Sequence, residues 1–157
     1  MINNDSIWLI HQKYMAKALQ LAEVAFDEDE VPVGAIIVYE NKIIGKGYNQ
    51  VQKLNDPTAH AEMIAISSAI QTIGQKYLKD ATIYVTLEPC PMCAGALAWS
   101  KINKVVYAAS DASYGACGSI YNLHHDGHLN HTFEVIQGIL EMESEYLLKN
   151  FFQQKRI

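Results

Sequence analysis

Residues 82–93, Thr-Ile-Tyr-Val-Thr-Leu-Glu-Pro-Cys-Pro-Met-Cys, decide the fold of this chain. The β-branched and aromatic residues at 82–86 predict a strand, which ends near Glu88-Pro89 because proline cannot continue the hydrogen-bond ladder of a central strand. Pro91 suits the first turn of a helix, so a helix is predicted over residues 91–100. A strand that leads directly into a helix is typical of α/β folds.

Similar signals extend outward in both directions. Apolar residues at three- and four-residue steps predict a helix over residues 6–26. A second helix is predicted to open at Asp56-Pro57, with the aspartate as cap and the proline in the first turn. The other predicted elements are a hairpin of strands 34–39 and 42–48, strands 104–109 and 133–136, and a terminal helix over 141–154. This alternation predicts an α/β sandwich, in one domain over residues 1–157.

Composition narrows the class of protein. Of the 157 residues, 50% are hydrophobic and 18% are charged, which fits one globular domain. No apolar run approaches the roughly 18 residues of a membrane helix, and the N-terminus lacks the basic flank of a secretory signal, so we expect a cytoplasmic protein without a membrane segment. The net charge of −5 excludes a strongly basic nucleic-acid binder. A local basic face stays open, and the cations that could form it are Lys42, Lys46, Lys53, Lys101, Lys104, Lys149, Lys155 and Arg156.

Two of the three cysteines, Cys90 and Cys93, form a Cys-x-x-Cys pair. In the first turn of a helix their side chains would face the same side, and the helix N-terminus would favour their thiolate forms. His60 is the third candidate ligand, because zinc accepts both sulfur and imidazole nitrogen. Three protein ligands leave one coordination position for water, which is typical of a catalytic zinc site rather than a structural one.

Glu62 completes the predicted site. On a regular helix His60 and Glu62 would point in roughly opposite directions, so they converge only if His60 lies in an irregular first turn. A carboxylate beside the open coordination position can act as a proton shuttle. We therefore predict Glu62 as the catalytic residue and His60, Cys90 and Cys93 as the metal ligands.

Each motif alone has a simpler interpretation. The Cys-x-x-Cys pair is compatible with a redox pair, although no thioredoxin-like βαβ unit precedes it, and His60 is compatible with a core histidine. The combination of His-x-Glu with Pro-Cys-x-x-Cys is far more specific, and it is the pattern of zinc-dependent nucleobase deaminases. Four of the six histidines fall within residues 124–131, which we interpret as a loop rather than a second metal site, and Cys117 is expected to be a partly buried residue that binds no metal.

From about Tyr14 to Arg156 the chain resembles the cytidine deaminase-like superfamily, and more closely its bacterial tRNA-specific adenosine deaminases. The segments that carry the resemblance include residues 30–35 (EVPVGA), 56–62 (DPTAHAE), 82–96 and the aromatic and basic C-terminal end. The resemblance implies a three-layer α/β/α sandwich with a central mixed five-stranded sheet, a homodimer and one zinc ion per subunit. It also implies hydrolytic deamination of adenosine to inosine at the wobble position, with the tRNA anticodon stem-loop as substrate.

The resemblance further implies four substrate-binding residues. Asn49 is expected to hydrogen-bond the flipped base and Val31 to pack on it. Asp111 is expected to approach the target nucleotide, where a carboxylate can accept a hydrogen bond from a ribose 2′-OH. Phe152 is expected to stack on an unpaired base, with the nearby cations on phosphates. The alternatives are a turn role for Asn49 and Asp111 and a core role for Val31 and the terminal aromatics.

Two other functions remain open from the sequence. A deaminase of a free base or nucleotide, such as guanine or cytosine, would share the zinc site and Glu62. A non-enzymatic protein with structural zinc would only bind RNA or a partner, but Glu62 and the lack of a fourth Cys or His at finger-like spacing argue against it.

Overall fold

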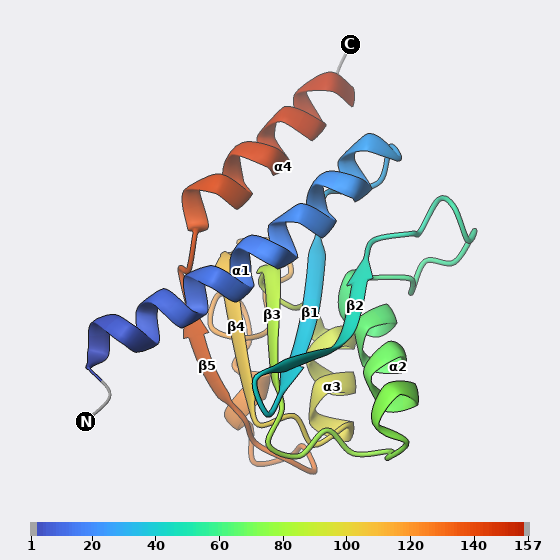
Figure 1. Cartoon of the computed structure of the whole chain (residues 1–157). Helices are drawn as coiled ribbons and strands as arrows, with labels where there is room; N and C mark the ends of the chain where they lie inside the picture. Colours follow the sequence, from blue (N-terminus) through green and yellow to red (C-terminus); the bar gives the residue numbers. More distant parts are fainter. Residues whose placement is uncertain (1–2, 156–157) are drawn as a thin grey trace.

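The computed structural model describes residues 3–155 and contains a five-stranded sheet with helices on both faces (Figure 1). The strands, in the sheet order β2-β1-β3-β4-β5, are β1 (Gly34–Tyr39), β2 (Lys42–Tyr48), β3 (Thr82–Leu87), β4 (Lys104–Ala109) and β5 (Glu134–Gln137). The helices are α1 (Asn4–Asp27), α2 (Ala61–Ile73), α3 (Pro91–Trp99) and α4 (Glu141–Lys155), with a short 3₁₀ turn, η1 (Leu123–His125).

The sheet is mixed, as expected. Strand β1 runs antiparallel to β2 and β3, whereas β4 runs parallel to both β3 and β5. The hairpin between β1 and β2 turns at Glu40 and Asn41, whose φ angles are 49° and 61°. Two consecutive residues with positive φ match the twist of a two-residue hairpin, so the predicted turn is confirmed.

Alternate residues of the central strands face opposite layers of helices. In β1, Ala35 and Ile37 pack into the cluster that includes α2 and α3, whereas Ile36 and Val38 pack into the cluster that includes α1. Helix α4 contacts α1, β3 and β4, so it shares the α1 face (Figure 1). The predicted three-layer sandwich is therefore confirmed. Within residues 3–155, no helix has both the length and the apolar character needed to cross a membrane.

Helix α1 lies so close to β1 that only glycine fits at residue 34. A Cβ there would lie 2.1 Å from the Ala18 carbonyl oxygen and 2.6 Å from the Ala22 nitrogen. We expect Gly34→Ala to lower the free energy of unfolding by about 3 kcal/mol, measured by urea denaturation, because overpacking forces the layers apart. In the control Gly95→Ala no heavy atom beyond the neighbouring backbone of α3 lies within 4 Å of the new Cβ, so its stability should be unchanged or slightly higher. Equal losses in both variants would contradict this account.

The predicted start of the second helix is wrong. Helix α2 begins at Ala61 rather than at Asp56-Pro57. The Asp56 carboxylate instead accepts hydrogen bonds from the Thr58 N–H at 2.8 Å and the Thr58 hydroxyl at 2.7 Å, which closes a local turn. His60 is consequently the N-cap of α2, in extended conformation at φ −75° and ψ 154°. The other predicted boundaries differ by at most two residues from those observed.

Candidate active site

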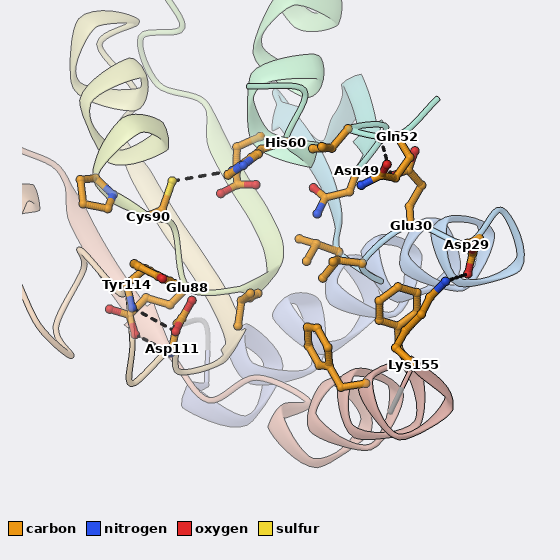
Figure 2. Close-up of a pocket in the computed structure, with 18 residues that line it drawn as sticks. Asp29, Glu30, Asn49, Gln52, His60, Glu88, Cys90, Asp111, Tyr114 and Lys155 are labelled. Atoms are coloured by element: carbon orange, nitrogen blue, oxygen red, sulfur yellow. Dashed lines mark hydrogen bonds and ion pairs between the residues drawn. The ribbon is translucent and has the colours of Figure 1, made fainter. Parts of the chain in front are cut away.

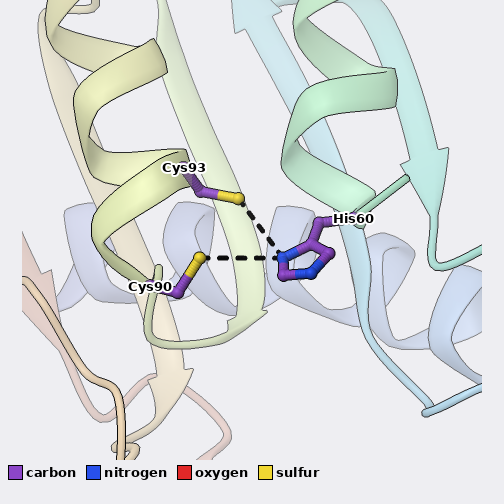
Figure 3. A group of neighbouring side chains, drawn as sticks. All are labelled: His60, Cys90 and Cys93. Carbon is purple, nitrogen blue, oxygen red and sulfur yellow. Dashed lines mark hydrogen bonds between the residues drawn. The ribbon is translucent and has the colours of Figure 1, made fainter. Parts of the chain in front are cut away.

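Two helix starts meet beside the carboxyl end of β3. His60 is the N-cap of α2, Cys90 is the N-cap of α3, and Cys93 lies in the first turn of α3. The Nδ1 atom of His60 lies 3.7 Å from Cys90 Sγ and 3.6 Å from Cys93 Sγ (Figure 3). All three candidate ligand atoms lie within 4.8 Å of one another. Two short segments, thirty residues apart in the chain, thus bring two sulfurs and one nitrogen together.

This spacing fits a zinc ion. In a tetrahedral site with Zn–S of about 2.3 Å and Zn–N of about 2.0 Å, sulfur and nitrogen ligands lie roughly 3.6 Å apart. The two measured sulfur–nitrogen distances, 3.6 and 3.7 Å, agree with that value. The two-sulfur, one-nitrogen donor set also favours zinc over harder cations. His60, Cys90 and Cys93 can therefore hold zinc through Nδ1 and two Sγ atoms.

The two cysteines differ in how readily they ionise. The hydrogen bond from Cys93, together with a weaker effect of His60, lowers the pKa of Cys90 to about 4. The same hydrogen bond and burial raise the pKa of Cys93 above its ordinary value. Cys90 is thus readily a thiolate, whereas Cys93 needs a cation beside it to lose its proton.

Glu62, the second residue of α2, lines the same cavity as His60 and Cys90. Its side chain is buried, and burial raises the pKa of its carboxyl above the ordinary value. Because His60 stands outside the helix as its N-cap, the two side chains reach one cavity despite being only two residues apart. The arrangement provides a buried carboxyl group, suited to holding and releasing a proton, close to the candidate metal ligands.

A cavity of about 850 Å³ leads from the candidate ligands toward α4 (Figure 2). This volume is in the range of sites that hold a nucleotide-sized ligand. The walls include all four residues predicted to bind substrate: Val31, Asn49, Asp111 and Phe152. The structure therefore brings these four residues together with Glu62 around one space.

Asn49 and Asp111 also have structural roles. Asn49 Oδ1 accepts a hydrogen bond of 2.8 Å from the N–H of Ala61, the first residue of α2. Asp111 Oδ1 accepts hydrogen bonds from the N–H groups of Ser113 at 2.9 Å and Tyr114 at 3.1 Å. Asp111 therefore stabilises a turn, which confirms the structural alternative. The Oδ2 atom of the same carboxylate is left for a ligand.

The far end of the cavity is formed by α4. Phe151 and Phe152 both line the cavity, but Phe151 is buried and packs edge-on against Phe26, whereas Phe152 is 45% exposed. Lys155 reaches across to Asp29 at 2.6 Å, and both side chains are largely exposed (Figure 2). One aromatic is thus core and the other accessible. Arg156, the other cation expected here, lies outside the described residues.

Two pocket residues were not singled out from the sequence. Glu30 and Glu88 are each only 2% exposed, yet both line the cavity. Each carboxylate accepts hydrogen bonds from the backbone of a distant loop. The sequence held one indication that these glutamates are buried. Each lies near a proline and the end of an apolar strand, in Glu30-Val31-Pro32 and in Glu88-Pro89.

The histidine segment forms no second metal site among residues 3–155. His131 Nε2 lies 2.7 Å from the Ile102 carbonyl oxygen, and His128 Nδ1 lies 2.7 Å from Asp126 Oδ1. Within that part of the chain, only His60, Cys90 and Cys93 form a group able to hold a metal ion. Cys117 is more buried than expected, at 1% exposed.

Comparison with known proteins agrees with this geometry. The family model of the cytidine and deoxycytidylate deaminase zinc-binding region matches residues 9–109. The chain belongs to this deaminase family. The matched residues include all three candidate metal ligands and Glu62, so zinc is the cofactor of this chain and these ligands could hold it.

Curated members of the deaminase family resemble this chain over most of their length. The tRNA-specific adenosine deaminase of Aquifex aeolicus is 47% identical over 143 residues, which cover 91% of this chain and 94% of the relative. The tRNA-specific adenosine deaminase of Bacillus subtilis is 42% identical over 143 residues, covering 91% and 89%.

Solved structures of the deaminase family confirm the predicted fold. A structure from a study of A-to-I editing by tRNA:A34 deaminases at the wobble position matches with a TM-score of 0.84 and 39% identity, covering 87% of this chain and 99% of the other. A guanine deaminase from Bacillus subtilis matches with a TM-score of 0.63 and 39% identity, covering 69% and 70%.

Proposed function

We propose that this protein is a zinc-dependent hydrolase that deaminates adenosine to inosine at the wobble position of a tRNA anticodon stem-loop. The observation that carries the proposal is the cavity itself. It joins the two-sulfur, one-nitrogen ligand group to Glu62 at one end and to Phe152 at the other. The tRNA-specific adenosine deaminases that are 42–47% identical to the chain support the same substrate class.

The metal ligands and Glu62 have different roles in the proposed reaction. His60, Cys90 and Cys93 would hold zinc, which would supply a Lewis acid able to activate a water molecule for attack on C6 of adenine. Glu62 would receive the first proton from this water and pass it to N1 of the base, and it would then take the remaining hydroxyl proton from the oxygen added at C6 and pass it to the departing amine. One water molecule is consumed, ammonia leaves, and the base becomes hypoxanthine.

The rest of the cavity would hold the RNA around the target base. Val31 and Asn49 line the same cavity as His60 and Glu62, where a flipped base would pack, and Phe152 belongs to α4, where a neighbouring base could stack. Among residues 3–155, Lys155 is the cation that lines the cavity, and it is paired with Asp29, while Lys53 of the neighbouring connection is paired with Glu28. We therefore expect shape and base flipping to contribute more to binding than phosphate contacts.

Product analysis distinguishes this proposal from deamination of free bases. That alternative is tested because a guanine deaminase is similar to this chain. Zinc-loaded protein would be incubated with a transcribed anticodon stem-loop and, separately, with free adenine, guanine and cytosine. Inosine in the stem-loop, detected by mass spectrometry, without turnover of free bases is the expected outcome. Turnover of guanine or cytosine with unchanged RNA would overturn the proposal.

Asp111→Asn should reduce the preference for RNA over DNA. Asparagine keeps Oδ1 for the turn but replaces Oδ2, the proposed acceptor of a ribose 2′-OH, with an amide. We expect the ratio of kcat/KM on matched RNA and DNA hairpins to fall about tenfold, the equivalent of one charged hydrogen bond. A ratio equal to that of the wild type would contradict this role.

We also propose a homodimer, with one deaminase domain per chain spanning residues 1–157 and a cytoplasmic location. Trp99 on α3 is 69% exposed, and Ile120 and Tyr121 are each 50% exposed. Large apolar side chains left open to solvent are typical of a protein–protein interface. The single-domain proposal is supported by the one sheet that both core clusters share. Sedimentation equilibrium tests the dimer.

A further inference from the structure

Two buried carboxylates line the cavity but have no part in the proposed chemistry. Glu30 and Glu88 are as buried as Glu62, and a buried carboxylate in a cavity is commonly a catalytic acid or base. Their hydrogen-bond partners decide what they do. Both point their oxygens at backbone N–H groups of loops that form the cavity walls.

Glu88 is fully occupied. Its Oε1 accepts from the Asp111 N–H at 3.1 Å and from the Ser119 hydroxyl, and its Oε2 accepts from the N–H groups of Cys117 and Ser119, both at 3.0 Å. A carboxylate has about four acceptor positions, so four donors leave none for substrate or water. Glu88 is therefore not an acid or base.

Gly115 shows how closely the loop follows this carboxylate. A Cβ at residue 115 would lie 2.4 Å from Glu88 Cδ and 2.5 Å from the Asp111 carbonyl oxygen. Residues 111–119 thus fold around the carboxylate and bring Asp111 and Tyr114 to the cavity. Without Glu88, several backbone N–H groups of this loop would lose their partner.

Glu30 does the same on the other side. Its Oε1 accepts a hydrogen bond from the Gln52 N–H at 2.9 Å (Figure 2), and its Oε2 accepts one from the Lys53 N–H at 2.9 Å. These residues belong to the long connection between β2 and α2, which carries Val51 and Gln52 to the cavity. Lys53 of the same connection also forms an ion pair with Glu28 at 3.7 Å. This pair is exposed, so it contributes little to holding the connection in place.

We infer that Glu30 and Glu88 are positioning residues that hold the two loop walls of the cavity, and that they set the affinity for the RNA around the target base rather than the rate of the chemical step. The inference rests on the proposed function for its substrate. Preformed walls reduce the ordering that binding would otherwise require, so losing them weakens binding and leaves the zinc ligands and Glu62 in place.

Amide variants test this inference. Glu30→Gln and Glu88→Gln keep the size of the side chain. Each replaces one accepting oxygen with an NH₂ group, which cannot accept a hydrogen bond from the backbone N–H groups. The exposed Glu28→Gln is the matched control. We expect KM for the stem-loop to rise about tenfold in each buried variant, with kcat within about twofold and zinc content unchanged. Amide hydrogen exchange should accelerate at residues 111–119 in Glu88→Gln and at 52–53 in Glu30→Gln, but not in the control.

Two results would overturn the inference: KM values equal to that of Glu28→Gln, or a fall in kcat at unchanged KM. If Glu88→Gln does not fold, Ser119→Ala removes the Ser119 hydroxyl bond and retains the three backbone donors to Glu88, so a two- to threefold rise in KM is expected and no rise would count against Glu88. If the wild type does not deaminate RNA, the proposed function fails, and hydrogen exchange alone decides whether the carboxylates hold the loops.

Discussion

Glu62→Ala should deaminate the anticodon stem-loop at least about 10³-fold more slowly than the wild type while retaining one zinc ion per subunit. The loss reflects the removal of the only carboxyl group in the cavity that is proposed to move protons, and general acid–base catalysis typically contributes 10²- to 10⁴-fold. Single-turnover formation of inosine gives the rate, and elemental analysis gives the zinc content.

Glu62→Gln is the companion variant. Glutamine fills the same buried volume as the glutamate but cannot carry the proton, so an equally large loss is expected together with wild-type stability. If either variant retained wild-type activity, Glu62 would not be the proton shuttle. A loss of zinc in Glu62→Gln would instead place the carboxylate among the ligands.

Cys93→Ala should abolish both zinc binding and turnover. Cys93 is fully buried and supplies one of the two sulfurs of the ligand group. With two ligands left, we expect zinc content after dialysis to fall from about one to near zero per subunit, and activity to fall by about 10⁴-fold or more. Zinc is measured by elemental analysis and folding by circular dichroism.

Cys117→Ala provides a matched control for this loss. Cys117 is also buried, but its thiol is not part of the ligand group. Its replacement should leave zinc content and turnover close to those of the wild type. Retention of zinc by Cys93→Ala, or an equal loss in Cys117→Ala, would mean that the metal is held elsewhere.

The sequence predicted most of the fold because its signals were local. The short apolar, β-branched runs of β1 and β3, the proline that opens α3 and the two-residue turn after Tyr39 each act within a few positions. The start of α2 was misplaced for a related reason. Asp56 has the chemistry of a helix cap, but the hydroxyl and N–H of Thr58 competed for its carboxylate, and propensity does not reveal which partner prevails.

The site was predictable only in part. His60, Cys90 and Cys93 form a motif whose spacing itself indicates a metal, and the structure brings them together. Glu30 and Glu88 carry no such motif. The N–H groups that donate hydrogen bonds to Glu88 belong to residues more than twenty positions further along the chain. Only the folded backbone brings them to the carboxylate.

The hydrogen bond from Ala61 to Asn49 has a consequence for recognition. With Oδ1 engaged by the first N–H of α2, the amide group cannot turn over without leaving that N–H unpaired. What Asn49 can offer a ligand is its NH₂ group. At this point the cavity wall is therefore a donor, complementary to an unprotonated ring nitrogen or a carbonyl and mismatched to an exocyclic amine. The beginning of a helix thus fixes which hydrogen-bonding group of Asn49 faces away from the backbone and is left for a ligand.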